Sequence, residues 1–284
     1  MRRIGFTRLL PWCVLLLAHQ DRLAAQLPKP RSLDYLSAAG VDDARASWLN
    51  PAGLGRVLEA SVMAELVVDR PPAGDARLAQ YTLGMNSRGI SFAFARDRGS
   101  DTLGVSIFRF GLGIPLGRSA SVGWAVSLYR GGVRDEGVDL GLRYGLGRAI
   151  ELGAVVRNLS EPAVRDTLLP LTGVGAVAWS PLWQRVELWG EVHAVRLGEE
   201  GGYEARYRSG LRVATGGRTP VRLVVSVDFD SSLEPRRWTA GLVVGALDRI
   251  GLLGSASPQA GELGRLDRLS AFGLASRRAP GALR

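Results

Sequence analysis

Apolar side chains recur at every second position along most of this sequence, from about residue 58 onward. Between residues 138 and 146, five large apolar residues alternate with four small or charged ones: Val138, Asp139, Leu140, Gly141, Leu142, Arg143, Tyr144, Gly145 and Leu146. Successive side chains of a β-strand point to opposite faces, so this spacing puts apolar residues on one face and small or polar residues on the other. The chain is therefore predicted to be built almost entirely from β-strands.

Fourteen segments carry this alternation. They are residues 58–69, 77–86, 88–97, 101–112, 119–130, 136–146, 149–157, 171–179, 184–196, 203–214, 219–229, 236–247, 250–257 and 267–276. Most are close to ten residues long, which is the length that a tilted strand needs to cross a bilayer. Even-numbered connections tend to be shorter than odd-numbered ones, as in outer-membrane barrels with short periplasmic turns and longer external loops. The sequence thus predicts a closed antiparallel transmembrane β-barrel of about 14 strands over residues 58–276.

A soluble secreted β-sandwich is the alternative all-β interpretation, because it too produces alternation. The second face of the strands, however, mixes Gly, Ala and Ser with charges of both signs, which fits the tight interior of a small barrel better. In the barrel, the inward charges are expected to form a polar network in the lumen. Its predicted members are Asp139, Arg143, Glu187, Glu191, His193, Arg206, Arg208 and Arg212.

The N-terminal 25 residues have the order of a secretory signal peptide. Arg2, Arg3 and Arg8 precede the apolar run of residues 9–18, and small residues end at Ala25, where cleavage is expected. No later run approaches the ~20 apolar residues of a membrane-spanning helix, which excludes a polytopic helical membrane protein. The one cysteine, Cys13, lies in the predicted signal peptide, so no disulfide framework is expected. Residues 26–57 and the tail 277–284 lie outside the predicted barrel.

Residues 26–57 lack alternation. Asp42 or Asp43 could cap a short helix that runs to Trp48. The following Asn50-Pro51-Ala52-Gly53 has the residue preferences of a type I turn, with Asn at the first, Pro at the second and Gly at the fourth position.

This opening resembles a known superfamily. Small residues and glycine, then Asp42-Asp43, an aromatic residue and residues 50–54 shortly after a signal peptide resemble the start of the FadL-type outer-membrane proteins. That superfamily includes long-chain fatty-acid transporters and PorV/PorQ-like proteins, and residues 153–159 and 169–181 resemble the second branch. The resemblance implies a fourteen-stranded barrel with residues 26–57 folded inside as a hatch. It also implies that Asn50, Pro51 and Ala52 gate the passage of hydrophobic molecules.

The residues offer little support for catalysis or cofactor binding. Glu187, Glu191 and His193 share one predicted strand face and could serve a serine nucleophile. A lumen hydrogen-bond network is the preferred explanation, because a barrel lipase must present its nucleophile to lipid and this face points away from it. Asp228, Asp230 and Glu234 could bind calcium weakly, or simply form a solvated loop. No catalytic residue, metal site or cofactor is therefore predicted, and the chain is not expected to be an enzyme.

Two functions follow from the barrel interpretation. The first is passive passage of small hydrophobic molecules through a lumen gated by the hatch. The second is a non-transporting scaffold for exported or surface proteins, as the PorV/PorQ-like resemblance implies. The expected location is the outer membrane of a Gram-negative-type cell, with outer-membrane lipids as partners, together with a hydrophobic small molecule or an exported protein. The formal net charge of +9 is too weak a signal to indicate a nucleic-acid partner, and none is expected.

Overall fold

The structure is a computed structural model. It describes residues 31–56, 60–70, 75–98, 104–131, 134–164, 167–182, 185–198, 201–216, 219–245, 249–259 and 262–277. The predicted signal peptide and the tail beyond residue 277 lie outside these residues, so both remain predictions.

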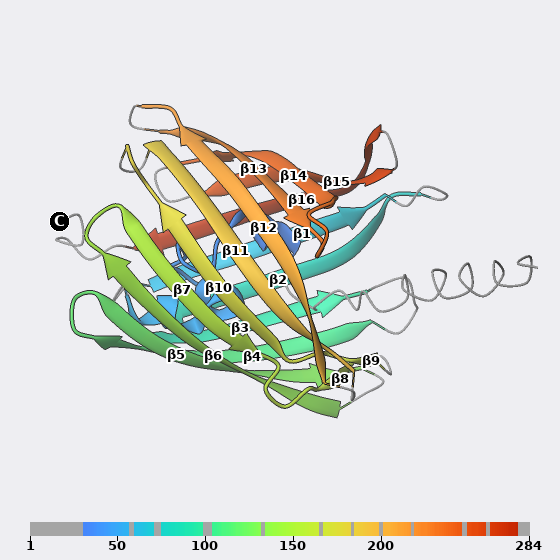
Figure 1. The fold of residues 1–284 in the computed structure, drawn as a ribbon, viewed down its shortest axis with the longest axis horizontal. Helices are drawn as coiled ribbons and strands as arrows, with labels where there is room; N and C mark the ends of the chain where they lie inside the picture. Colours follow the sequence, from blue (N-terminus) through green and yellow to red (C-terminus); the bar gives the residue numbers. More distant parts are fainter. Residues whose placement is uncertain are drawn as a thin grey trace, which may run out of the picture.

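Fourteen antiparallel strands form one closed barrel (Figure 1), as the sequence predicted. The strands are β1 (Ala60–Asp69), β2 (Arg77–Ser87), β3 (Ile90–Asp97), β4 (Val105–Leu116), β5 (Ala120–Arg130), β6 (Arg134–Leu146), β7 (Ile150–Arg157), β10 (Thr172–Trp179), β11 (Val186–Leu197), β12 (Gly202–Ala214), β13 (Val221–Phe229), β14 (Pro235–Val244), β15 (Ile250–Gln259) and β16 (Glu262–Arg277). Each pairs with its neighbours along the chain, and β1 pairs with β16 to close the sheet. The sandwich alternative is wrong, because a single sheet closes on itself instead of stacking on a second one.

A small hairpin interrupts the connection between β7 and β10. Its strands are β8 (Ala163–Val164) and β9 (Thr167–Leu168), and the sequence assigned this stretch to a loop. Leu169 and Val164 of this connection are buried and belong to the main hydrophobic cluster inside the barrel. The connection therefore folds inward at its end of the barrel.

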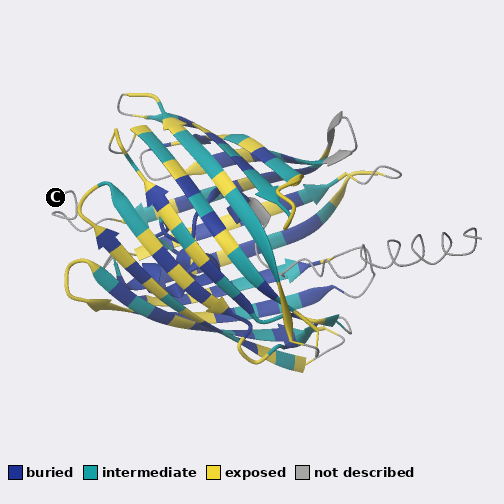
Figure 2. Cartoon of the chain, viewed as in Figure 1, coloured by how far each residue is buried: buried dark blue, intermediate teal, exposed yellow. Residues whose placement is uncertain are grey.

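Alternation along the strands separates an apolar outer face from a mixed inner face (Figure 2). Outward side chains such as Leu66, Leu83 and Leu140 are 54%, 54% and 48% exposed, whereas the inward Glu65 and Asp139 are 2% and 5% exposed. This arrangement is the reverse of a soluble protein, and it is the one that a lipid environment requires. Among the described residues, no helix has the length and apolar character needed to span a membrane.

The two rims of the barrel differ. We call the rim where β1 begins and β16 ends the terminal rim, and the opposite one the distal rim. Connections at the terminal rim are tight in the first half of the barrel, as at 88–89, 117–119 and 147–149, but lengthen to 180–185 and 215–220 later. The predicted difference in loop length thus holds only in part. At the distal rim the β11–β12 hairpin stays paired as far as Leu197 and Gly202, so longer strands take the place of longer loops.

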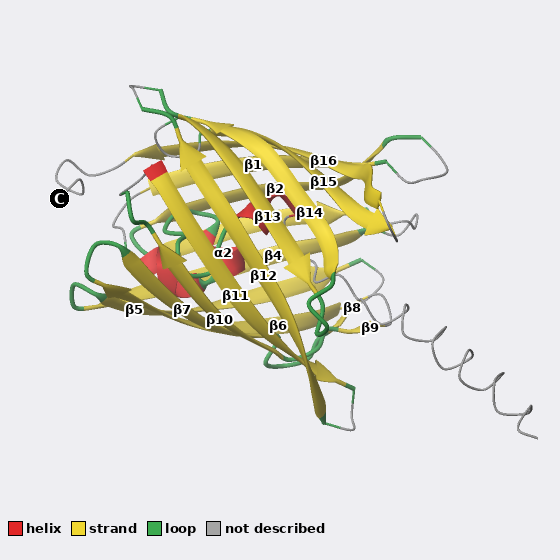
Figure 3. Cartoon of the chain, turned by 45° about the horizontal axis from the view of Figure 1, so that its top comes forward, coloured by secondary structure: helices red, strands yellow, loops and turns green. Residues whose placement is uncertain are grey.

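Residues 31–56 lie inside the barrel and are called the inner segment here (Figure 3). It contains η3 (Arg31–Tyr35), the single helical turn α2 (Ala46–Leu49) and η4 (Pro51–Gly55). Nearly every described side chain from Leu33 to Gly55 is buried. The predicted cap by Asp42 or Asp43 is wrong: α2 begins one residue after Arg45, whose side chain makes no cap, and the Asp43 carboxylate binds Arg45 instead.

We expect Leu140→Arg to lower the free energy of unfolding by about 2–4 kcal/mol, because a guanidinium at the middle of the lipid-facing belt loses its hydration. Leu140 pairs with Trp124 and Val156, whose side chains are also exposed on the outer face. Denaturant unfolding of the refolded protein in lipid vesicles measures the change.

The matched control is Leu182→Arg. Leu182 is 60% exposed in the connection between β10 and β11, beyond the ends of the strands. Its guanidinium remains in water, so the change is expected to stay within about 0.5 kcal/mol. Equal effects of the two substitutions would contradict a lipid-facing belt.

Candidate functional site inside the barrel

A row of glycines on the inner wall supports the turn of the inner segment. Gly113 of β4, Gly123 of β5 and Gly141 of β6 are direct cross-strand partners, and we call them the glycine row. A Cβ added at Gly123 would overlap the Pro51 carbonyl group, and one added at Gly141 would overlap the Asn50 side-chain oxygen. Only glycine therefore lets the backbone of residues 50–55 lie directly on these strands.

Two further glycines extend this close contact. A Cβ on Gly153 of β7 would come within 2.8 Å of the Ala38 carbonyl oxygen, and one on Gly111 of β4 within 2.9 Å of the Leu54 Cδ1 atom. The inner segment is thus fitted to the wall of β4–β7 at the level of backbone atoms, which leaves no gap between them for a bound molecule.

Asn50 uses its whole side chain to fix the turn. Its Nδ2 group donates to the carbonyl oxygens of Ala38 at 2.9 Å and Leu142 at 3.0 Å, while its Oδ1 accepts from the Ala52 N–H at 3.1 Å. Asn50 and Ala52 are both fully buried. The side chain therefore joins three parts of the molecule, and an aspartate could not make the two donated bonds.

The predicted gating residues Asn50, Pro51 and Ala52 thus lie together against the glycine row. Their role as a gate is not tested by this arrangement and stays a prediction. The geometry shows that the turn is held on both sides, by the wall and by Ala38 of its own segment.

Two strands beyond β7 in the barrel, Glu191 of β11 holds the inner segment. One carboxylate oxygen accepts from the Ala38 N–H at 2.6 Å, and the other lies 2.9 Å from Nε2 of His193. Arg208 of β12 approaches the same carboxylate at 3.9 Å and also contacts Asp34 at 3.7 Å and Asp228. The pair that could have served a serine nucleophile is therefore occupied in holding the segment.

Three inward arginines donate to backbone carbonyls of the inner segment. Arg109 binds the Ser47 oxygen at 2.6 Å, Arg143 the Val41 oxygen at 2.8 Å, and Arg157 the Leu49 oxygen at 2.8 Å. These carbonyls would otherwise be buried without partners, because so short a helical turn satisfies few of them. Arg109 was missed from the sequence, although its inward position follows from the alternation of β4.

The predicted lumen residues all point inward, but they form several separate groups of ion pairs instead of one network. Glu191, His193 and Arg208 meet around Ala38, as described. Asp139 pairs with Arg109, Arg143 lies 3.3 Å from Glu151, and Glu187 lies 2.7 Å from Arg212. Arg206 pairs with Glu204 on its own strand at 2.6 Å and is the most exposed of the set.

Apolar contacts complete the site. The Tyr35 ring stacks on Phe272 of β16 with centroids 5.7 Å apart, and the Arg45 guanidinium lies 5.7 Å from the same ring. Leu33, Leu49 and Leu54 of the inner segment are buried in the main apolar cluster. Wall residues of that cluster include Ile107, Val224, Val243 and Leu253. Among the described residues, no three or more His, Cys, Asp or Glu side chains gather as a metal site would require.

Solved structures share this architecture. The toluene transporter TbuX of Ralstonia pickettii superposes with a TM-score of 0.63 at 11% identity, over 89% of this chain and 98% of that one. The toluene transporter TodX of Pseudomonas putida gives 0.56 at 11% identity, over 85% and 97%. A bacterial polysaccharide outer-membrane secretin gives 0.51 at 10% identity, over 78% and 99%.

These likenesses confirm the predicted resemblance to FadL-type outer-membrane barrels at the level of the fold. The three proteins are named as transporters or a secretin of bacteria, not as enzymes. No family model and no curated protein sequence matches this chain.

Gly123→Ala is expected to destabilise the protein by about 1–3 kcal/mol, because the new methyl group collides with the Pro51 carbonyl and displaces the turn. The matched control is Gly175→Ala in β10, where an added Cβ meets nothing within 4 Å. Denaturant midpoints measure stability, and trypsin cleavage after Arg56 in detergent measures release of the inner segment. A segment that stays protected and a midpoint that equals the control would refute this role of the glycine row.

Asn50→Asp is expected to cost about 1–3 kcal/mol, because its carboxylate faces the carbonyl oxygens of Ala38 and Leu142 without a proton to donate. Asn86→Asp in β2 is the control, since Asn86 is also buried and its Oδ1 accepts from Ser61. Its Nδ2 finds no partner among the described residues, so the aspartate keeps every bond that the asparagine makes. Comparison of the two denaturant midpoints tests the role of the Asn50 donor.

Proposed function

We propose that this chain is an outer-membrane barrel through which small hydrophobic molecules pass, with the inner segment acting as a hatch. The observation that carries the proposal is the inner segment itself: a buried, largely apolar stretch that lies inside the barrel and packs on apolar wall residues. Two proteins that share the fold are named toluene transporters, which supports an aromatic hydrocarbon as the first molecule to test.

The turn of Asn50, Pro51 and Ala52 serves as the fixed end of the hatch. It lies against the glycine row, where backbone atoms of residues 51–55 meet Gly123 and Gly113 and the buried Asn50 side chain meets Gly141. Residues 33–41 form the moving end. The Ala38 N–H donates to the Glu191 carboxylate and the Ser226 hydroxyl donates to the Asp34 carbonyl oxygen, while the Ala38 backbone also lies against Gly153 of β7. Such bonds contribute about 1–3 kcal/mol each, which thermal motion can overcome far more often than it unpacks the turn.

In the membrane, the terminal rim faces the periplasm and the distal rim faces the outside. The protruding β11–β12 hairpin and the inward-folded β7–β10 connection at the distal rim support this orientation, since external connections of such barrels are the elaborate ones. The mature chain begins after Ala25, so that the inner segment enters the barrel close to the new N-terminus.

Uptake of radiolabelled toluene by intact Gram-negative cells that lack their own hydrophobic channels tests the proposal. Cells that express the chain are expected to take up toluene several-fold faster than cells with an empty vector, and heat-modifiable gel migration confirms that the barrel has folded. A correctly folded barrel that leaves uptake at the empty-vector rate would refute passage.

Loss of the Glu191 carboxylate, which accepts from the Ala38 N–H, is expected to raise the rate of uptake about tenfold. The reason is that a charged hydrogen bond of about 1.5 kcal/mol no longer holds the closed state. The variant is Glu191→Ala. The control is Glu187→Ala, four residues earlier on the same inward face, whose carboxylate pairs with Arg212. If both variants change the rate equally, residues 33–41 are not the moving end.

The scaffold function remains the second candidate. The dense polar anchoring of the inner segment by Arg109, Arg143 and Arg157 favours it, because a permanently closed barrel has no need of a mobile hatch. Isolation of the barrel from its native membrane with a stoichiometric exported protein, combined with no uptake of toluene, would support the scaffold over the channel.

A further inference from the structure

Five of the six connections between strands at the terminal rim contain an arginine that the structure describes. All five are exposed, and they are followed by small residues or by the first residue of the next strand. We call them the arginine ring: Arg88 between β2 and β3, Arg118 between β4 and β5, Arg148 between β6 and β7, Arg185 between β10 and β11, and Arg249 between β14 and β15. The sixth connection, between β12 and β13, contains Arg218, which lies outside the described residues.

Two described carboxylates at this rim are directed into the barrel. The carboxylate of Glu151 points into the barrel and binds Arg56 and Arg143, both at 3.3 Å, while that of Glu187 binds Arg212 at 2.7 Å. These are the described carboxylates of the strand ends nearest the arginine ring, and neither is paired with a member of it.

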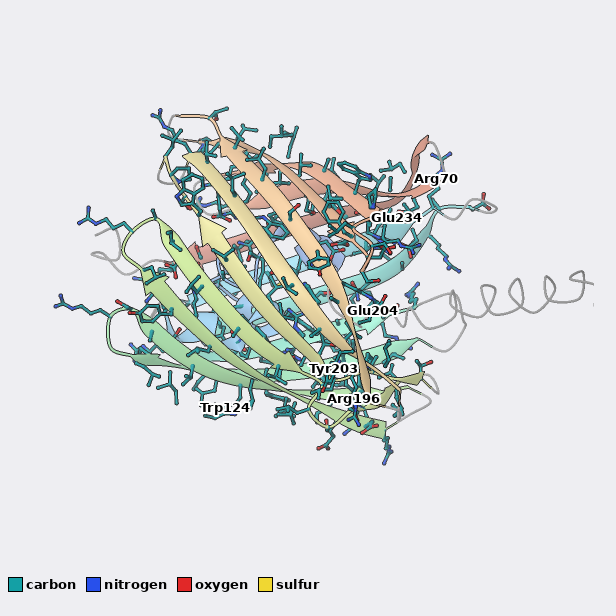
Figure 4. The ribbon with its side chains drawn as sticks, viewed as in Figure 1. Arg70, Trp124, Arg196, Tyr203, Glu204 and Glu234 are labelled. Atoms are coloured by element: carbon teal, nitrogen blue, oxygen red, sulfur yellow. The ribbon has the colours of Figure 1, made fainter. Side chains whose placement is uncertain are left out.

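The described residues of the distal rim carry exposed charges of both signs. Arg236 pairs with Asp230 at 2.8 Å, and Arg196 pairs with Glu161 at 3.2 Å. Figure 4 shows residues of both signs at this rim, among them Arg70, Arg196, Glu204 and Glu234. The positive excess of the chain is therefore concentrated at one end of the barrel rather than spread over its surface.

The arginines also stand at the edge of the lipid-facing belt. Ile90, Leu116, Leu146 and Ile250 are exposed apolar residues within two positions of Arg88, Arg118, Arg148 and Arg249, respectively. Connections two strands apart in a barrel of tilted strands are roughly 12 Å from one another along the rim. Single charges spaced evenly around the whole rim match the lipid head groups, which surround a barrel on all sides. A protein partner would instead require a charged patch on one side of the rim.

We propose that the arginine ring binds the phosphate groups of anionic phospholipids in the leaflet at the terminal rim. A guanidinium donates two parallel hydrogen bonds to phosphate oxygens, and its long stem can lie along the apolar belt while the charge reaches the head groups. The ring fixes the depth of the barrel in the membrane at this rim. This inference does not depend on whether molecules pass through the lumen.

Fluorescence quenching by lipids with brominated chains tests the proposal. Trp179 ends β10 at the terminal rim and is 45% exposed, so its emission reports which lipids lie there. Trp124, which points away from the barrel on β5 (Figure 4), is first replaced by phenylalanine, together with Trp183 and Trp238. Trp48 and Trp189 are buried inside the barrel, so lipid bromines do not quench them. Vesicles of brominated phosphatidylglycerol mixed with phosphatidylcholine, and the reverse mixture, then give the relative binding constant of the two lipids.

We expect phosphatidylglycerol to bind about fivefold more tightly than phosphatidylcholine beside the reporter, the effect of roughly one arginine at an anionic surface. The preference should fall towards one in 1 M salt, where the screening length is about 3 Å. It should also fall towards one when Arg88, Arg118, Arg148, Arg185 and Arg249 are all replaced by glutamine.

The control carries the same loss of charge at the distal rim, with Arg70, Arg77, Arg98, Arg134 and Arg236 replaced by glutamine. All five of these residues are exposed. This variant is expected to keep the lipid preference at Trp179, and heat-modifiable migration confirms that both variants fold. Equal loss in the two variants, or a preference that survives loss of the ring, would overturn the proposal. Tight binding of soluble polyglutamate by the detergent-solubilised barrel, with no lipid preference in vesicles, would assign the ring to an acidic protein partner instead.

Discussion

The pairing of β1 with β16 is the contact on which the rest of this structure depends. Ala60–Asp69 runs antiparallel to Arg268–Arg277 residue for residue, so the sheet has no free edge. In hydrocarbon, an edge strand would leave its N–H and C=O groups without water or protein partners, at several kcal/mol for each group. Closure removes that cost, and it also divides every strand into a face towards lipid and a face towards an enclosed space.

The enclosed space must then be filled by groups that satisfy one another. The inward faces supply charges, and the inner segment supplies backbone carbonyls and N–H groups that its short helical turns leave unbonded. Arg109, Arg143 and Arg157 donate to three of those carbonyls, and Glu191 accepts from the Ala38 N–H. The polar groups of the wall and of the segment therefore satisfy each other's hydrogen bonds. Without the other partner, each set would be left unbonded in a dry interior.

This mutual fit also limits how a hatch can work. Contacts of residues 51–55 with Gly113 and Gly123 are made largely by backbone atoms, which no change of rotamer can relieve, and the contact with Gly141 is made by the Asn50 side-chain oxygen. Contacts of residues 33–41 with Glu191 and Ser226 are made by side chains, which can move away and return. In the proposed transport, the turn is the fixed part of the hatch and residues 33–41 are the part that moves.

Much of the site could be predicted because the alternation of a strand is local. The inward positions of Glu191 and Arg208 follow from their own strands, and the fourteen strands follow from the same rule. The extents of the strands were less predictable: β15 and β16 continue beyond the expected residues 250–257 and 267–276, because their hairpin remains paired as far as Gln259 and Glu262. The cap expected at Asp42 or Asp43 is missed because α2 begins only at Ala46, and the Asp43 carboxylate accepts from the N–H and the guanidinium of Arg45, just before the helix.

The sequence by itself determined which residues face lipid, because a period of two is imposed by the geometry of each strand and needs no partner. It also placed a rigid turn at residues 50–53. Only the tertiary structure decided where that turn rests and what holds it. Glu191 meets Ala38 across 153 residues of chain, and Asn50 meets Leu142 across 92. Such contacts exist only after the barrel has closed around the segment. The register of every strand is then set by the whole ring of interstrand hydrogen bonds.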